Sequence, residues 1–272
     1  MNWVALRVTP ATNRDGVIAA LFEAGSQGVH EDGEAVVTHF PSDAELDDIR
    51  NAVMSVDPHA DIAIAEAPDT DYSQWRASVS LHRVGELVIA PPWLVNETDR
   101  GRLVIIDPVM AFGTGEHAST RGVMRLMQGV VQPGDFVADL GAGSAVLSIA
   151  AAKLGAVRVA AIELDHDSIG NAEENVLAND VEDRVEIIEG DAAILLPLLA
   201  PVRVILANII SSVLIPLLPT MRTSLWSGGQ AILAGILQDE RAAMVDAIDA
   251  DGWVIEREDT EDVWWSVQIA PR

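Results

Sequence analysis

The chain has 272 residues, of which 49% are hydrophobic, enough to bury the core of one large domain or two small ones. It contains no cysteine, which excludes disulfides, thiolate metal sites and cysteine nucleophiles. Its 42 acidic and 17 basic residues give a net charge of −25, which repels phosphate backbones and argues against stable nucleic-acid binding.

The acidic surplus has three interpretations. Lys153 is the only lysine, which is compatible with adaptation to salt; the charge could instead attract a basic partner or simply form a solvated surface. No apolar run reaches the roughly 18–20 residues that cross a bilayer, and the N-terminus lacks the pattern of a signal peptide. We therefore expect a cytoplasmic monomer without membrane association.

Residues 1–67 are predicted to form a small separate unit. Strands are expected at 3–8, 28–30, 35–40 and 61–65, with helices at 14–24 and at 42–56, where Ser42 is the expected cap. The order βαββαβ is that of an α+β ferredoxin-like fold. No cluster in this unit has evident catalytic chemistry, so its role is either structural or the recognition of a macromolecule.

Residues 68–100 are predicted to connect this unit to the rest of the chain. Their apolar side chains favour packing over a flexible tether, and a short strand is expected at 87–90, stopped by Pro91 and Pro92. We expect this segment to help line a cleft. These apolar residues include Tyr72, Trp75, Leu81, Val84 and Trp93.

Beyond Leu103 strands and helices alternate, which predicts an α/β fold with a mostly parallel sheet. The last two strands leave no room for a helix between them and should form an antiparallel hairpin. Strands are expected at 136–138, 157–162, 185–188, 202–207, 230–234, 253–256 and 263–269. Helices are expected at 146–154, 168–178, 192–199, 213–225 and 240–250.

A glycine pair follows the first of these strands. Asp139, Gly141 and Gly143 precede the helix at 146–154, and Glu163 ends the next apolar run. The glycines permit a tight turn and close ligand approach, and an acid at the second strand tip can take both hydroxyls of a ribose. A nucleoside-bearing cofactor is indicated; an ordinary strand-to-helix turn is the alternative. Val146 occupies the third glycine position of a dinucleotide site, so that pattern fails.

The second informative run is 107–120, in which Gly113 and Gly115 bracket a hydroxyl and Ser119-Thr120 opens a helix. Such a loop could close over a ligand and offer hydroxyls to a carboxylate. The alternative is that the glycines only turn the chain and the serine only caps the helix.

Three further side chains carry two interpretations each. Asn208 stands at the end of the fourth strand, as a hydrogen-bonding group or a turn former. Asp191 follows the third strand, as a ligand contact or a helix N-cap, and His117 is either a base or a cap. The six histidines show no metal-ligand spacing, and Asp165 to Asp167 should cap a helix, so no metal site is predicted.

The pattern Asp-x-Gly-x-Gly at 139–143 resembles motif I of the class I S-adenosylmethionine (SAM) methyltransferases. The run 107–120 strongly resembles the Phe-Gly-Thr-Gly-x-His-x-x-Thr loop of the PrmA family, the methyltransferases of ribosomal protein L11. Residues 71–93, 207–210, 227–229 and 234–237 also look like landmarks of that family. The resemblance covers nearly the whole chain.

The resemblance implies a seven-stranded Rossmann-like methyltransferase domain at 101–272, a linker at 68–100 and a recognition domain at 1–67 that binds the ribosomal protein. Its cofactor would be SAM, and Asn208 would also meet the target amine as the catalytic residue. The implied cofactor-binding residues are Thr120, Asp139, Gly141, Gly143, Glu163, Asp191 and Asn208. Glu163, Ser119 and Ala145 depart from the usual Asp, Thr and Gly of the family.

The expected function is SAM-dependent N-methylation of amino groups, lysine side chains or the N-terminal amine, of that large-subunit ribosomal protein. A methyltransferase acting on another protein or a small molecule is one alternative, and a non-catalytic SAM-binding assembly factor is the other. A whole recognition domain argues against a small-molecule substrate, and intact Asp139, Glu163 and Asn208 argue against a scaffold.

Overall fold

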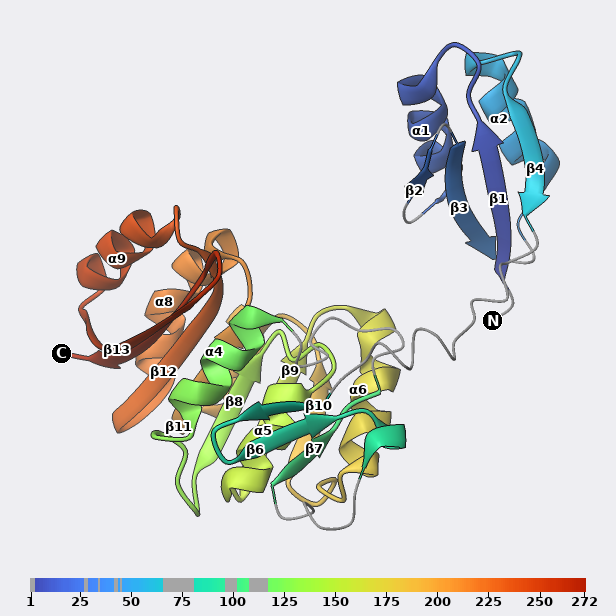
Figure 1. Cartoon of the computed structure of the whole chain (residues 1–272). Helices are drawn as coiled ribbons and strands as arrows, with labels where there is room; N and C mark the ends of the chain where they lie inside the picture. The colour runs from blue at the N-terminus through green and yellow to red at the C-terminus, as the bar shows by residue number, and fades with distance from the viewer. Residues whose placement is uncertain are drawn as a thin grey trace. The chain divides into compact units, whose positions relative to one another are not determined.

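The computed structural model describes residues 3–26, 29–33, 35–41, 44, 46–65, 81–95, 102–107 and 117–272. The chain divides into two compact units, Met1–Val79 and Ser80–Arg272 (Figure 1). The boundary lies inside the segment that the sequence predicts to be a linker. The predicted cap Ser42, and Tyr72 and Trp75 of that segment, lie outside the described residues.

The first unit has the predicted order of elements, and its four-stranded antiparallel sheet has the order β2-β3-β1-β4. Its elements are β1 (Trp3–Thr9), α1 (Arg14–Glu23), β2 (Val29–Asp32), β3 (Ala35–Pro41), α2 (Leu46–Val56) and β4 (Asp61–Ala65). The two helices pack on the sheet around a small apolar core that includes Val8, Leu21, Phe40 and Val53. Alternation along β1 and β3 supplies the sheet side of that core.

Asp57 ties the end of α2 to the turn before α1. Its carboxylate accepts hydrogen bonds from the backbone N–H groups of Ala11, Thr12 and Asn13 at 2.8–3.0 Å, and from the Thr12 hydroxyl at 3.1 Å. These bonds, led by the one from Thr12, hold the pKa of Asp57 well below its ordinary value. The carboxylate therefore satisfies the amides that precede α1.

The second unit contains the predicted seven-stranded sheet, in the order β10-β9-β8-β11-β12-β14-β13. Four neighbouring pairs are parallel, and β14 runs antiparallel to both of its neighbours, as expected for a C-terminal hairpin. The strands are β8 (Phe136–Leu140), β9 (Arg158–Glu163), β10 (Val185–Glu189), β11 (Val202–Asn208), β12 (Leu225–Leu237), β13 (Trp253–Glu261) and β14 (Trp264–Pro271).

Helices cover both faces of this sheet (Figure 1). Along β11, Val204 and Leu206 enter the core with α4, α5 and α6, whereas Ile205 and Ala207 enter the core with α7, α8 and α9. This alternation, apolar on both sides, is what a parallel strand covered on both faces requires. The helices are α4 (Ala118–Met127), α5 (Val146–Leu154), α6 (His166–Ala178), α7 (Ala192–Leu199), α8 (Ser211–Ser224) and α9 (Arg241–Ala250).

The sequence did not predict a second, three-stranded sheet in this unit, in the order β5-β6-β7. It consists of β5 (His82–Val84), the predicted strand β6 (Leu87–Ala90) and β7 (Leu103–Ile105); the short 3-10 helix η1 (Pro92–Leu94) follows β6. Leu87, Ile89 and Val104 from this sheet are buried in the core with α4 and α5. Residues 81–95 of the predicted linker therefore pack within the second unit.

The single lysine of the chain closes the end of one helix. Lys153 Nζ, from α5, donates to the backbone oxygen of Asn179, which ends α6, at 2.7 Å. Burial holds the pKa of Lys153 below its ordinary value, and the nearby charge of Arg184 acts in the same direction.

Candidate functional site

The glycine-rich turn joins β8 to α5 and needs its glycines. Gly141 and Gly143 have φ values of 69° and 52°, which residues other than glycine rarely adopt. A Cβ on Gly141 would lie 2.5 Å from Cγ2 of Ile209, so the turn could not hold a larger residue without moving that side chain. Gly141 N and Ala142 N both donate to the backbone oxygen of Ile162, at 2.9 and 3.1 Å.

Glu163 stands at the tip of β9, beside this turn. Its Oε2 accepts from Gly143 N at 2.7 Å and its Oε1 from Asp165 N at 2.8 Å. Each carboxylate oxygen can accept a second hydrogen bond, so two hydroxyl donors can still be accommodated. The longer side chain of glutamate thus reaches the glycine turn itself and keeps acceptor capacity for a paired diol.

Two cavities adjoin at the carboxyl ends of β8, β9 and β11, with volumes of about 650 and 240 Å³. Strand order reverses between β8 and β11, and this switch point is where open α/β sheets bind ligands. Both cavities are lined by Gly141, Glu163, Asn208 and Ile209. The larger continues past Leu164, Asp191 and the first turn of α8, and the smaller past Thr120, Gly143 and Ser168.

Asn208 ends β11 on the wall between the cavities. Its Nδ2 donates to Oγ1 of Thr120 at 3.1 Å, and Thr120 is fully buried. Among the described residues Oδ1 of Asn208 is buried without a hydrogen-bond partner. An unpaired buried acceptor is costly unless a ligand supplies the donor. The arrangement therefore suits a ligand that brings an N–H or O–H group.

Asp139 lies beneath the glycine turn and is not among the residues that line either cavity. Its Oδ2 accepts from Ser148 Oγ at 2.6 Å, and its Oδ1 has no partner among the described residues. Complete burial raises the pKa of Asp139 to about 7, and the charge of Glu163 acts in the same direction. Any effect on a ligand therefore passes through the turn or through water.

Both ambiguous cap residues do cap helices. Asp191 accepts from Ala193 N at 2.7 Å at the start of α7, and it also lines the larger cavity. His117 is the N-cap of α4, where Nδ1 lies 2.7 Å from Ser119 Oγ and accepts from Ser119 N at 3.4 Å. Burial, aided by the charge of Arg121, lowers the pKa of His117, which favours the neutral ring.

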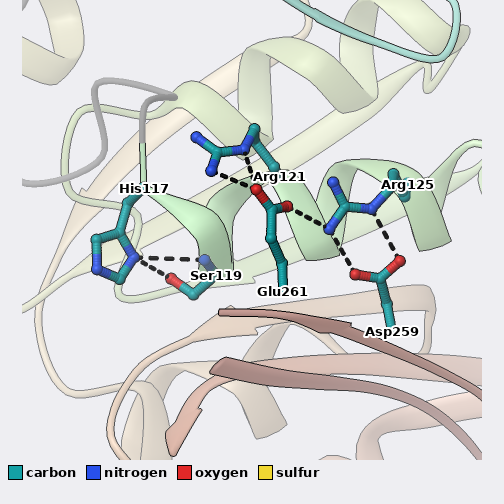
Figure 2. Close-up of polar contacts among 6 residues, drawn as sticks. All are labelled: His117, Ser119, Arg121, Arg125, Asp259 and Glu261. Atoms are coloured by element: carbon teal, nitrogen blue, oxygen red, sulfur yellow. Dashed lines mark hydrogen bonds and ion pairs between the residues drawn. The ribbon is translucent and has the colours of Figure 1, made fainter. Parts of the chain in front are cut away.

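The C-terminal hairpin contributes to the site in a way that sequence reasoning missed. Trp264 opens β14, lines the larger cavity and meets the His117 ring edge-on at a centroid distance of 4.7 Å. Figure 2 shows the adjoining ion pairs, in which Arg121 and Arg125 of α4 face Glu261 and Asp259 of β13. These contacts join residues far apart in the chain, so no local pattern reveals them.

Among these ion pairs, the one between Arg125 and Asp259 is bidentate. Its Nε and Nη2 donate to the two oxygens of Asp259 at 2.8 and 2.5 Å, and Nη2 lies 2.7 Å from Oε2 of Glu261. These acids raise the pKa of Arg125, and the two arginines lower that of Glu261. The hairpin therefore holds the helix that presents His117, Ser119 and Thr120 to the site.

Residues 108–116, which carry Gly113 and Gly115, lie outside the described residues, so the predicted loop closure stays a prediction. Within the described ranges there is no group of three or more histidine, aspartate or glutamate side chains arranged to hold a metal ion. No helix in those ranges is long and apolar enough to cross a membrane.

A mostly parallel sheet with a glycine turn after its first strand, an acid at the tip of the second and a cavity at the switch point defines the class I methyltransferase fold predicted from the sequence. The family model described as ribosomal protein L11 methyltransferase (PrmA) matches residues 4–271, and the chain belongs to that family. Both the fold class and the family resemblance are confirmed.

Relatives and a solved structure agree with this assignment. A ribosomal protein L11 methyltransferase of Symbiobacterium thermophilum is 37% identical over 219 residues, covering 77% of this chain and 68% of that protein. One from Heliobacterium modesticaldum is 30% identical over 307 residues, covering 98% and 96%. The crystal structure of a ribosomal protein L11 methylase from Lactobacillus delbrueckii subsp. bulgaricus has a TM-score of 0.64 and 28% identity, covering 71% of this chain and all of that one.

Proposed function

We propose that this methyltransferase uses SAM to methylate amino groups of ribosomal protein L11. The observation that carries the proposal is the pair of adjoining cavities whose shared wall consists of the glycine turn, Glu163 and Asn208. The larger cavity, at about 650 Å³, lies within the usual range for a ligand of this size.

The residues present fit the cofactor. Glu163 has acceptor capacity for the two ribose hydroxyls, and Gly141 leaves the space that a side chain would fill. Leu164 and Ala192 give apolar walls for a base, beside Asp191 as an acceptor for its amino group. Thr120, with Gly143 and Ser168, lines the smaller cavity, which suits the amino-acid end. When bound, SAM supplies a methyl group on a sulfonium, open to in-line attack.

The target amine must be neutral and aligned before it can attack. Asn208 Oδ1 is the acceptor that can hold an N–H of that amine, because its Nδ2 is already engaged by Thr120. His117 is held as a helix cap, so the amine proton is assigned to solvent and not to that ring. The catalytic contribution of the chain is then orientation of a neutral nucleophile beside the sulfonium.

Recognition of the target is assigned to the first unit, which is separately folded and acidic. The net charge of −25 is complementary to a basic protein and would speed encounter with it. A ribosomal substrate also implies that the enzyme acts in the cytoplasm. A small-molecule substrate would leave the first unit without a role.

The test is incubation of the full chain with methyl-labelled SAM and a mixture of ribosomal proteins, followed by identification of the labelled proteins and residues by mass spectrometry. We expect label on L11, on lysine or N-terminal amines. Label confined to another ribosomal protein would reassign the target, and no label on any ribosomal protein while SAM binds would refute the proposal and leave the two alternatives, a methyltransferase with a non-ribosomal substrate or a non-catalytic SAM-binding factor.

A further inference from the structure

Two buried amides, one in the last turn of α6 and one at its C-cap, have no place in the function described so far. Asn175 and Asn179 lie one turn apart, with 2% and 1% of their surface exposed. The side-chain amide of asparagine can make up to four hydrogen bonds, and burial requires protein partners for them. The identity of these partners therefore indicates the structural role of the residue. Asn179 Nδ2 donates to the backbone oxygen of Asn175 at 2.8 Å, and the remaining side-chain partners of the two residues differ.

Asn179 binds the backbone at the free edge of β7. Its Oδ1 accepts from Ile105 N at 2.8 Å, and its Nδ2 donates to Ile105 O at 2.6 Å. The amide therefore pairs with β7 as a neighbouring strand would, and satisfies backbone groups that the sheet β5-β6-β7 leaves at its edge. None of these contacts reaches the glycine turn.

Asn175 joins two segments that the sequence singles out. Its Nδ2 donates to Ser144 O in the glycine turn at 3.0 Å, and its Oδ1 accepts from Asp107 N at 3.0 Å. Asp107 is the first residue of the run 107–120, and Ser144 follows Gly143 directly. A third bond, from Nδ2 to Asn171 Oδ1 at 3.3 Å, ties the amide to its own helix.

The glycine turn is thereby held on both sides. Glu163 accepts the N–H of Gly143, and Asn175 donates to the carbonyl of Ser144, the next residue. Ala145 follows with a φ of 63°, a left-handed conformation that is unfavourable for alanine. Leaving this conformation would lower the conformational energy of the Ala145 backbone. The turn therefore depends on its hydrogen-bonded anchors to keep its shape.

We propose that Asn175 is a positioning residue for the cofactor site, which holds the glycine turn in its ligand-ready shape and fixes it relative to the start of the run 107–120. This rests on the proposed function, because the ligand is taken to be SAM. Supporting residues that lock the groups touching a ligand reduce the ordering that binding requires. Asn175 acts through the backbone of Ser144 and touches neither cavity.

The test compares Asn175→Ala with Asn179→Ala in the full chain. Both variants lose a buried amide from the same helix, so both should lower the thermal midpoint. Only Asn175→Ala should raise the Kd of SAM in calorimetric titration, by about tenfold over the Asn179→Ala value. Asn175→Asp keeps the acceptor for Asp107 N and loses the donor to Ser144 O, so it should also weaken SAM binding and is the variant to use if alanine unfolds the protein.

Hydrogen exchange without ligand separates this inference from the proposed function. Amides of residues 141–147 should exchange faster in Asn175→Ala and Asn175→Asp than in Asn179→Ala. Each variant is measured at the same number of degrees below its own thermal midpoint. Equal SAM affinity and equal exchange in the two alanine variants would overturn the positioning role. Failure of the parent protein to bind SAM would refute the proposed function, and the exchange comparison would still decide whether Asn175 anchors the turn.

Discussion

The side-chain amide of Asn208 donates to the hydroxyl of Thr120 across 3.1 Å, joining the end of β11 to the first turn of α4. This contact decides which end of the amide is left for a ligand. The donor end is used, and the acceptor end, Oδ1, is buried without a hydrogen-bond partner among the described residues, in a residue that lines both cavities. An asparagine that was fixed in the opposite sense would present N–H groups, which would bind the lone pair that a neutral amine needs for its attack on the methyl group.

Replacing Asn208 with alanine should therefore lower the rate of methyl transfer about a hundredfold, the loss typical of one positioning contact. The measurement is the single-turnover rate at saturating SAM and target, with folding checked by thermal melting. Thr120→Val, which keeps the shape and loses the hydroxyl, should give a smaller loss in the same direction. A rate near that of the parent in Asn208→Ala would leave Asn208 as a turn residue.

Replacing Glu163 with alanine should weaken SAM binding by about 1.5–3 kcal/mol, the usual value of hydrogen bonds to a charged group. Calorimetric titration gives the affinity. Glu189→Ala is the matched control, because Glu189 ends the neighbouring strand β10, is half exposed and is not among the residues that line either cavity. Equal affinity in the two variants would remove Glu163 from the cofactor site.

Asp139 predicts a pH dependence of stability. Burial raises its pKa from the ordinary 3.8 to about 7, so between these values the folded protein holds a proton that the unfolded chain releases. The contribution of Asp139 to stability should therefore fall as pH rises from 4 to 7 and change little above 7. Asp139→Asn should flatten this part of the profile, measured by denaturant unfolding without ligand. Parallel profiles for parent and variant would contradict the prediction.

The pair Arg125–Asp259 should couple by about 0.5–1 kcal/mol at low salt, because the contact is bidentate and only partly exposed. A double-mutant cycle with alanine at each position, read by unfolding free energy, measures this coupling. It should shrink at 1 M salt, since exposed charges are screened. Arg158 and Glu186, an exposed pair at 3.3 Å, provide a control with a coupling near zero.

A protein truncated to residues 80–272 should keep SAM affinity and lose methylation of L11, because cofactor and target are assigned to different units. The cut at Val79 spares β5 and β6, which pack within the second unit. SAM titration and labelled methyl transfer are measured on the same preparation. Methylation of L11 at the parent rate would show that the first unit is dispensable for recognition.

Sequence patterns were sufficient where local chemistry decides the structure. The helix bounds of α5 and α7, the strand β6 and the glycine turn followed from capping residues, apolar runs and glycines. Three-residue strands such as β5 and β7 are too short to show a period and were missed. Asn175 lies in the last turn of α6, and no local pattern predicts its burial, because its partners Ser144 and Asp107 are brought to it by the fold.

The position of Lys153 has a practical consequence for an enzyme whose proposed acceptors are amines. The chain offers one lysine, and its Nζ is engaged with the backbone oxygen at the end of α6. An amine-modifying enzyme with so few acceptors of its own has little capacity to label itself. Radioactive methyl groups found in protein after a reaction would therefore report the added target, with the enzyme contributing almost no background.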